Sequence, residues 1–164
     1  MTLRVGNKIV YPCQGPCLIG AVVRKVIGGI PTSFYRLAPL DSSGGVLFVP
    51  VEKISGLGIR QLMARSEVPK VLSHLKQAAA AARNGKERAT ANMKLLSSGS
   101  ALDLAQLIQS LTQLNGIRAL LPADRQALDR ARSMLICEIS EVMGKTKRAA
   151  EEELDGALNV LHEV

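Results

Sequence analysis

The chain has 164 residues, a formal net charge of +7 at pH 7 and a hydrophobic fraction of 47%. That apolar content is enough for one medium or two small folded cores, which argues against a disordered chain. Two Tyr, two Phe and no Trp leave few rings to stack on bases, which disfavours sequence-specific single-strand binding.

No apolar run approaches the roughly 18 to 20 residues that cross a bilayer, and the N-terminal stretch MTLRVGNKIV lacks the continuous apolar segment of a signal peptide. We therefore expect a cytoplasmic protein without a membrane partner. Three cysteines and two histidines suit neither a disulfide framework nor a zinc site, so no metal and no cofactor are expected. Cys13 and Cys17 lie four residues apart in a loop, where reduced thiols are favoured over a metal or redox role. Cys137 falls within an apolar helical stripe and is expected in a core.

The positive charge is spread unevenly along the chain. Residues 1–66 hold eight Lys and Arg against two acids, residues 67–148 hold thirteen against seven, and residues 149–164 hold five acids and no Lys or Arg. The second half therefore combines a basic body with an acidic tail. This distribution fits an acidic partner, although a solvated charged surface explains most of these residues one by one.

Up to about Gly58 the sequence has the pattern of short strands. Runs rich in β-branched residues are separated by Gly, Pro and Ser at intervals of roughly 8 to 12 residues. Gly28-Gly29 predicts a tight hairpin, because primed turns need positive φ, and residues 42–45 predict a looser turn. Strands are expected over 4–10, 17–27, 33–40 and 46–51, and they are expected to form a small, strongly bent β-barrel of SH3 or Tudor type.

From Ser66 onward the apolar spacing becomes helical, which predicts two domains, a β-rich one over 1–66 and an all-helical one over 67–164. Ser66 is expected to cap a helix that runs to about residue 82 and stops at Asn84-Gly85. Further helices are expected over 86–96, from Ser100 to Asn115, from Pro122 to Gly144 and from Thr146 onward. Short turns join these helices, so they are expected to form a compact five-helix domain. The predicted fold class is therefore α+β, with β first and α second.

No group of residues forms a convincing catalytic site. The glycine pairs at 28–29 and 44–45 lack the spacing of a phosphate-binding loop. His74 stands in a helical segment without a nucleophile or acid motif around it, and the acids at 151–153 suit the first turn of a helix. We therefore expect a protein that is not an enzyme.

The segment VGNKIVYP at residues 5–12, followed by Gln14-Gly15, resembles the opening of the polymerase-interacting module of the CarD/CdnL/TRCF family of bacterial transcription regulators. The likeness is strong in the first half and moderate in the helical half, and it covers nearly the whole chain. The matching positions are 28–29, 34–37, 46–51 and 58–60, then Asn84, Arg88, Asn92, 95–96, Gly99, Ala105, 124–125, 131–132, Leu135 and Glu138.

In that family the β module packs edge to edge against the β subunit of RNA polymerase, and the helical domain touches the upstream edge of the melted promoter. The resemblance thus implies a monomeric transcription regulator associated with the nucleoid through polymerase. Edge pairing relies on backbone hydrogen bonds, while neighbouring side chains give specificity. The polymerase-binding residues carried over by the resemblance are Arg24, Lys25, Val46, Phe48 and Pro50. Some relatives carry arginine at the position of Phe48, and the sequence leaves both an apolar contact and a core role open for it.

The helical half departs from the family pattern at the promoter contact. Family members generally follow the asparagine that matches Asn84 with a tryptophan that wedges into the minor groove, but here that position is Gly85, which cannot wedge. Glu87 also stands where relatives tend to carry arginine, so a phosphate contact becomes a repulsion. The cations that remain near this position as candidate DNA contacts are Arg83, Lys86 and Arg88. Arg125 and Arg132 are spaced two turns apart on one face of the helix expected from Pro122, which makes them a candidate second basic strip. For Arg125 and Arg132, solvated arginines are the competing interpretation.

The leading prediction is a regulator that docks on the polymerase β subunit and whose promoter contact is weak, redirected or lost. One alternative is a full open-complex stabiliser that wedges with Met93 or Leu96, although helical spacing places both residues in the core. A second alternative is an adaptor whose helical domain binds another protein. A third is an independent nucleic-acid-binding protein of Tudor or KOW type, which the scarcity of aromatic residues disfavours.

Overall fold

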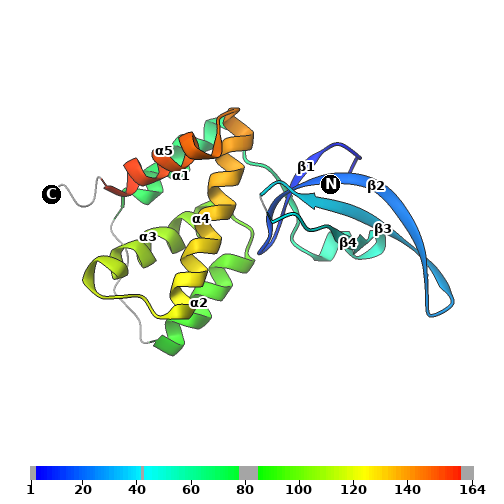
Figure 1. The fold of residues 1–164 in the computed structure, drawn as a ribbon, viewed down its shortest axis with the longest axis horizontal. Helices are drawn as coiled ribbons and strands as arrows, with labels where there is room; N and C mark the ends of the chain where they lie inside the picture. The colour runs from blue at the N-terminus through cyan, green and yellow to red at the C-terminus, as the bar shows by residue number, and fades with distance from the viewer. Residues whose placement is uncertain (1–2, 42, 78–84, 160–164) are drawn as a thin grey trace.

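The computed structural model describes residues 3–41, 43–77 and 85–159. Its first part is an antiparallel sheet with the strand order β4-β3-β2-β1-β5. The strands are β1 (Lys8–Tyr11), β2 (Gly15–Ile27), β3 (Ile30–Pro39), β4 (Leu47–Pro50) and β5 (Arg60–Gln61). Helices follow the sheet, so the predicted order of β first and α second is confirmed (Figure 1).

The sheet is open within the described residues, because β4 and β5 occupy its two outer positions and do not pair with each other. Between them the chain forms a 3-10 helix, η1 (Val51–Gly56), instead of continuing a ladder. The strand expected to begin at residue 4 begins only at Lys8. The reason is that Gly6 turns the chain with a φ of 90° and the Asn7 N–H donates to the Arg4 carbonyl.

The longest hairpin joins β2 and β3. Its ladder runs from the pair Cys17 and Pro39 to the pair Ile27 and Ile30, with a bulge between Ile19 and Val22. The turn at residues 28 and 29 has φ values of 59° and 79°, which confirms the tight turn predicted from the two glycines. The far half of the hairpin extends away from the helices as a twisted arm (Figure 1).

One face of the sheet forms a small apolar core. Six buried side chains make its centre, and side chains of η1 and of the segment after it cover it from one side. The buried residues are Leu3, Ile9, Cys17, Ile19, Leu37 and Val49, and Ile54, Leu57 and Ile59 are among the partly buried residues against them.

The second part of the chain consists of α1 (Val68–Leu75), α2 (Gly85–Ser97), α3 (Ala101–Ile117), α4 (Pro122–Met143) and α5 (Lys147–Asn159). Ser66 does not cap α1, because it lies within a 3-10 turn, η2 (Arg65–Glu67), and the cap position falls on Glu67. Ser100 does cap α3, since its side chain accepts the Asp103 N–H. Gly144 ends α4 at a φ of 65°, as predicted. In the described part of the chain, no helix has both the length and the apolar character needed to cross a membrane.

α4 is the central helix of this part and packs on α2, α3 and α5. The helical core draws on every helix and is built mainly from leucine, isoleucine and alanine. Cys137 on α4 is buried, as the apolar stripe predicted.

α4 also ties the helices to the sheet. The carboxylate of Glu138 is 1% exposed and accepts three hydrogen bonds of 2.7 Å, two from the guanidinium of Arg60 and one from the N–H of Met63. One turn farther along, Glu141 forms a 2.6 Å ion pair with Lys8. Of the two carboxylates that connect α4 to the sheet, that of Glu138 is therefore buried and that of Glu141 is partly exposed.

A second contact between α4 and the sheet lies nearer the beginning of α4, where the backbone before β2 and at its first residue approaches the helix closely. Arg130 donates from Nε to the carbonyl oxygen of Cys13 at 2.7 Å. Gly15 has a φ of 93°, and a Cβ at that position would lie 3.1 Å from Cγ of Met134. A side chain at residue 15 would thus strain the backbone, and Met134 on α4 would have to shift by a few tenths of an ångström to make room for it.

Candidate functional site

β4 is an outer strand whose ladder in the described residues is with β3 alone. Its other side therefore offers backbone groups to an added strand. Phe48 on this strand is 43% exposed, and Lys25 on β2 places its Nζ 3.9 Å from the centre of the Phe48 ring. A cation is attracted to the face of an aromatic ring, so the pair links β2 to β4 across β3. Of the two roles left open for Phe48, the core role is excluded by this exposure.

Residues that pair directly across a ladder lie on the same side of a sheet. Phe48 pairs with Arg36, and Lys25 reaches the same ring from β2. Pro50 lies two residues after Phe48 and shares its side, while Val49 between them is buried in the sheet core. We call the surface formed by Lys25, Arg36, Phe48 and Pro50 the outer face.

Arg24 and Val46 lie beside the outer face and not on it. Because side chains alternate along a strand, Arg24 projects to the side opposite to Lys25. Val46 is exposed and immediately precedes β4. The structure therefore brings together Lys25, Phe48 and Pro50, keeps Val46 at the adjacent end of β4, and separates Arg24 from them.

In the helical half, Arg88 is buried and forms an ion pair with Asp124 in the first turn of α4. Its Nε lies 3.0 and 3.1 Å from the two carboxylate oxygens and its Nη2 lies 2.8 Å from one of them. Asn92 donates to the same carboxylate at 3.2 Å. Contact of Arg88 with a phosphate would leave the carboxylate of Asp124 buried without its charge partner, which is costly. Arg88 has a structural role that joins α2 to α4.

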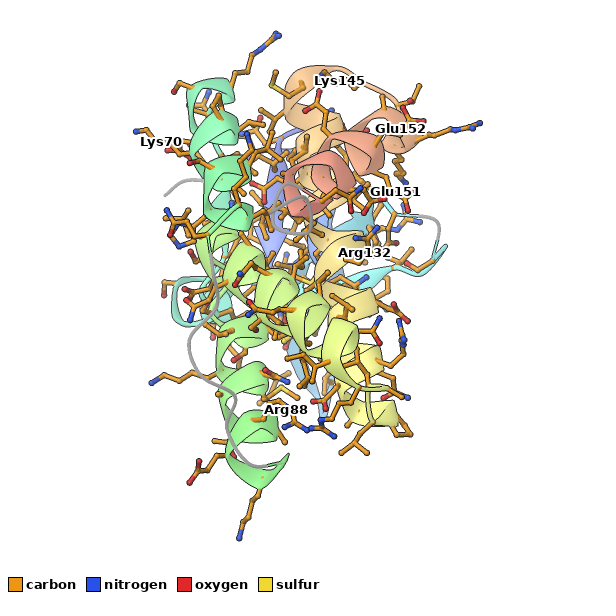
Figure 2. All side chains as sticks on the ribbon, turned by 90° about the vertical axis from the view of Figure 1, so that its left-hand side faces the viewer. Lys70, Arg88, Arg132, Lys145, Glu151 and Glu152 are labelled. Atoms are coloured by element: carbon orange, nitrogen blue, oxygen red, sulfur yellow. The ribbon has the colours of Figure 1, made fainter. Side chains whose placement is uncertain are left out.

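The remaining predicted DNA contacts differ in exposure. Arg132 pairs with Asp155 at 2.8 Å and with Glu151 at 3.3 Å, so two acids of α5 neutralise it (Figure 2). Lys86 is exposed in the first turn of α2, and Arg125 is exposed in the first turn of α4. Arg83 lies outside the described residues.

Lys86 and Arg125 share one end of the helical part, because the pair formed by Arg88 and Asp124 joins the beginnings of α2 and α4 (Figure 1). We call this region the basic end, defined by Lys86 and Arg125. Gly85, which the resemblance predicts to stand where relatives carry tryptophan, is the first residue of α2 and so belongs to the same end.

The two residues considered as replacement wedges fall in different environments. Leu96 is buried and belongs to the helical core, as its spacing predicted. Met93 is 59% exposed, so the prediction that it lies in the core is wrong. The reason is that α2 packs on α3 and α4 through residues such as Arg88, Asn92 and Leu96, which turns Met93 toward solvent.

The cysteines have the surroundings of structural thiols. Burial raises the pKa of Cys17 to about 12 and that of Cys137 to about 11, which suppresses the reactive thiolate. Cys13 is partly buried against the helical core. Among the residues that the structure describes, no cluster of His, Cys, Asp and Glu suits a metal ion.

The sequence interpretation missed two groups of residues. The first is the buried contact of Arg60 with Glu138, which joins positions 78 apart in the chain. Both residues had stood out only through the family likeness. The second is a set of exposed aliphatic side chains at the end of the β2–β3 hairpin, namely Val26, Ile27 and Ile30. The available signal was that the two residues on each side of Gly28-Gly29 are apolar.

Comparison with known proteins covers both halves of the chain. Residues 3–63 match the family model of the CarD-like/TRCF RID domain, and residues 67–155 match that of the CarD C-terminal domain. The chain is also 23% identical over 148 residues to a protein of Bacillus subtilis (strain 168) named "Putative transcription factor YdeB". That alignment covers 88% of this chain and 95% of the Bacillus protein.

Proposed function

Because the chain belongs to the CarD family of transcription regulators, we propose that it docks on the β subunit of RNA polymerase through β4 and the outer face. In this proposal a strand of the β subunit adds to the free side of β4, and Lys25, Phe48 and Pro50 contact the neighbouring surface. Domains 1–66 and 67–164 would serve separate partners, a division that the two family matches support.

The observation that carries the proposal is the exposed pair of Lys25 and Phe48 beside an unpaired strand edge. The family match supports polymerase as a partner in general, and we propose that the contact lies at β4 and the outer face. An exposed aromatic ring held by a cation is a low-entropy anchor of the kind that dominates binding energy at protein interfaces. Arg36 on the same face adds positive charge that favours an acidic partner surface.

For the helical half we propose a weakened contact with promoter DNA. Gly85 removes the wedge, while Arg88 and Arg132 are engaged within the protein. Lys86 and Arg125 at the basic end remain as exposed cations among the predicted DNA contacts. Two phosphate contacts give a slope of about −2 for log K against log salt, well below that of a dedicated DNA-binding protein.

The test is a pair of titrations of the full chain, one with the isolated polymerase β lobe and one with fork-junction promoter DNA, each at low and physiological salt. Lys25→Glu should weaken binding to the lobe at least tenfold, and Phe48→Ala should weaken it by a similar factor, since truncating a hot-spot residue costs about 2 kcal/mol or more. Lys70→Glu is the matched control, because Lys70 is an exposed lysine on α1 and not on the sheet (Figure 2). Unchanged affinity in the Lys25 variant would refute the placement of the docking surface.

The DNA titration separates the proposal from the full promoter stabiliser. Absent or weak binding with a shallow salt slope supports the weakened contact. Tight binding with a steep slope would instead mean that another group has replaced the wedge, and exposed Met93 would be the first residue to substitute.

The exposure of Met93, Ile117 and Leu121 on the helical part favours a second candidate function, an adaptor that brings another protein to polymerase. In that case Met93→Ser should abolish the effect of the protein on transcription in cells while leaving its affinity for the β lobe intact. Retention of the cellular effect would contradict the adaptor role.

A further inference from the structure

Apart from the two-residue strand β5, the sheet has in the described residues a second free edge that the proposed docking does not use. β1 pairs with only the first residues of β2, from Gly15 to Leu18. The last hydrogen bonds on that side of β2 join Ile19 to Gly6 and Asn7. Beyond Ile19, no hydrogen bond within the described chain occupies the outer side of β2, so residues 20–27 form an edge on the side opposite to β4.

This second edge is apolar as well as open. The arm formed by the far half of the hairpin carries four exposed aliphatic side chains, and no helix covers it (Figure 1). They are Val22, Val26, Ile27 and Ile30, of which Val26 is 71% exposed. A long, apolar, unpaired edge is a template for another strand, and proteins usually blunt such edges with charges, prolines or a covering element.

The charges on the hairpin select among possible occupants. Residues 15–40 contain Arg24, Lys25 and Arg36 and not one Asp or Glu. A second copy of the chain paired along the same edge would bring these like charges together, which is destabilising in a ladder. An acidic strand would place its carboxylates opposite Arg24.

We propose that residues 20–27 of β2 accept an acidic, extended segment of a partner protein as an added strand. The backbone edge supplies affinity, the aliphatic side chains Val22 and Val26 supply apolar contact, and Arg24 supplies charge selection. Docking at β4 and strand addition to residues 20–27 use different edges of the sheet, so one molecule can bind both partners at once.

The test is an NMR titration of the full chain, labelled with ¹⁵N, against three synthetic peptides. The first is acidic and strand-forming, Glu-Val-Glu-Val-Glu-Val-Glu. The second replaces each Glu by Lys, and the third is the acidic peptide N-methylated at every backbone nitrogen, so that neither of its edges can donate a hydrogen bond. We expect the acidic peptide to shift the amide signals of residues 20–27 and to bind at least tenfold more tightly than the other two.

Arg24→Glu should reduce affinity for the acidic peptide at least fivefold, with Lys70→Glu as the control for net charge. Equal binding of the N-methylated peptide would refute strand addition, and equal binding of the basic peptide would refute charge selection. Shifts confined to residues 47–50 would assign the peptide to β4. Concentration-dependent dimerisation through 20–27, or the same shifts with duplex DNA, would overturn the proposal in favour of a second copy or of nucleic acid. Failure of polymerase docking alone would leave all of these results unaffected.

Discussion

Removing the charge of Glu138 should uncouple the sheet from the helices. In Glu138→Gln the side chain keeps its size, but one acceptor oxygen becomes an NH₂ group that faces the donors of Arg60 and Met63. Breaking a buried ion pair costs about 3–5 kcal/mol. Because the Arg60 side chain is 27% exposed and water can reach it, we expect the lower end, about 3 kcal/mol.

Glu141→Gln is the matched control for this variant. Glu141 lies one turn along the same helix and also joins α4 to the sheet, but its partner Lys8 is 46% exposed. A solvated ion pair contributes about 1 kcal/mol or less, so this variant should be nearly as stable as the parent. With a urea m-value of about 1–3 kcal/mol/M, the Glu138 variant should lose about 1–3 M in its unfolding midpoint.

The assay follows urea unfolding with two probes. Circular dichroism at 222 nm reports mainly the helices, whereas tyrosine fluorescence reports the sheet, because both tyrosines of the chain, Tyr11 and Tyr35, lie in strands. In the parent the two transitions should coincide, and in Glu138→Gln they should separate. Equal losses in the Glu138 and Glu141 variants, with coincident transitions in both, would refute the role given to the buried carboxylate.

Three further outcomes follow from the burial of single groups. Arg88→Met should destabilise the protein by about 3–5 kcal/mol in urea unfolding, because it leaves the carboxylate of Asp124 buried without its cation, whereas Lys86→Ala should change stability by less than about 0.5 kcal/mol. A thiol reagent at pH 8 should label partly buried Cys13 before Cys17 and Cys137, and equal labelling rates for all three would contradict the burial. The two raised thiol pKa values mean that the folded protein keeps protons that the unfolded chain loses, so stability should fall as pH rises from about 9 toward 12. That fall, measured by urea midpoints at pH 8 and 10.5, should be smaller in a Cys17→Ala, Cys137→Ala variant.

Local patterns predicted most of the secondary structure. Gly28-Gly29 fixed the hairpin because only residues tolerant of positive φ can make so tight a turn, and Ser100 and Gly144 marked helix ends for similarly local reasons. The same locality explains the errors. Gly6 shortened the first strand, and Ser66 entered a 3-10 turn, since turn geometry at an element boundary depends on where the next element packs.

The family motif could also be recognised without coordinates, because it consists of residues adjacent in sequence. Whether an individual charged side chain is exposed or paired could not be predicted in this way. Arg88 and Asp124 are 36 positions apart, and Arg60 and Glu138 are 78 apart. Whether such an arginine faces a ligand or a buried carboxylate depends on which helices and strands pack against each other.

The sequence by itself thus determined the order of strands and helices and the family. The tertiary structure decided which cations remain exposed, that Phe48 and Met93 face solvent, and that β4 and residues 20–27 of β2 each have one edge without a ladder partner in the described residues. The physical reason is that backbone preferences act over a few neighbouring residues, whereas burial and charge pairing are set by contacts between segments distant in the chain.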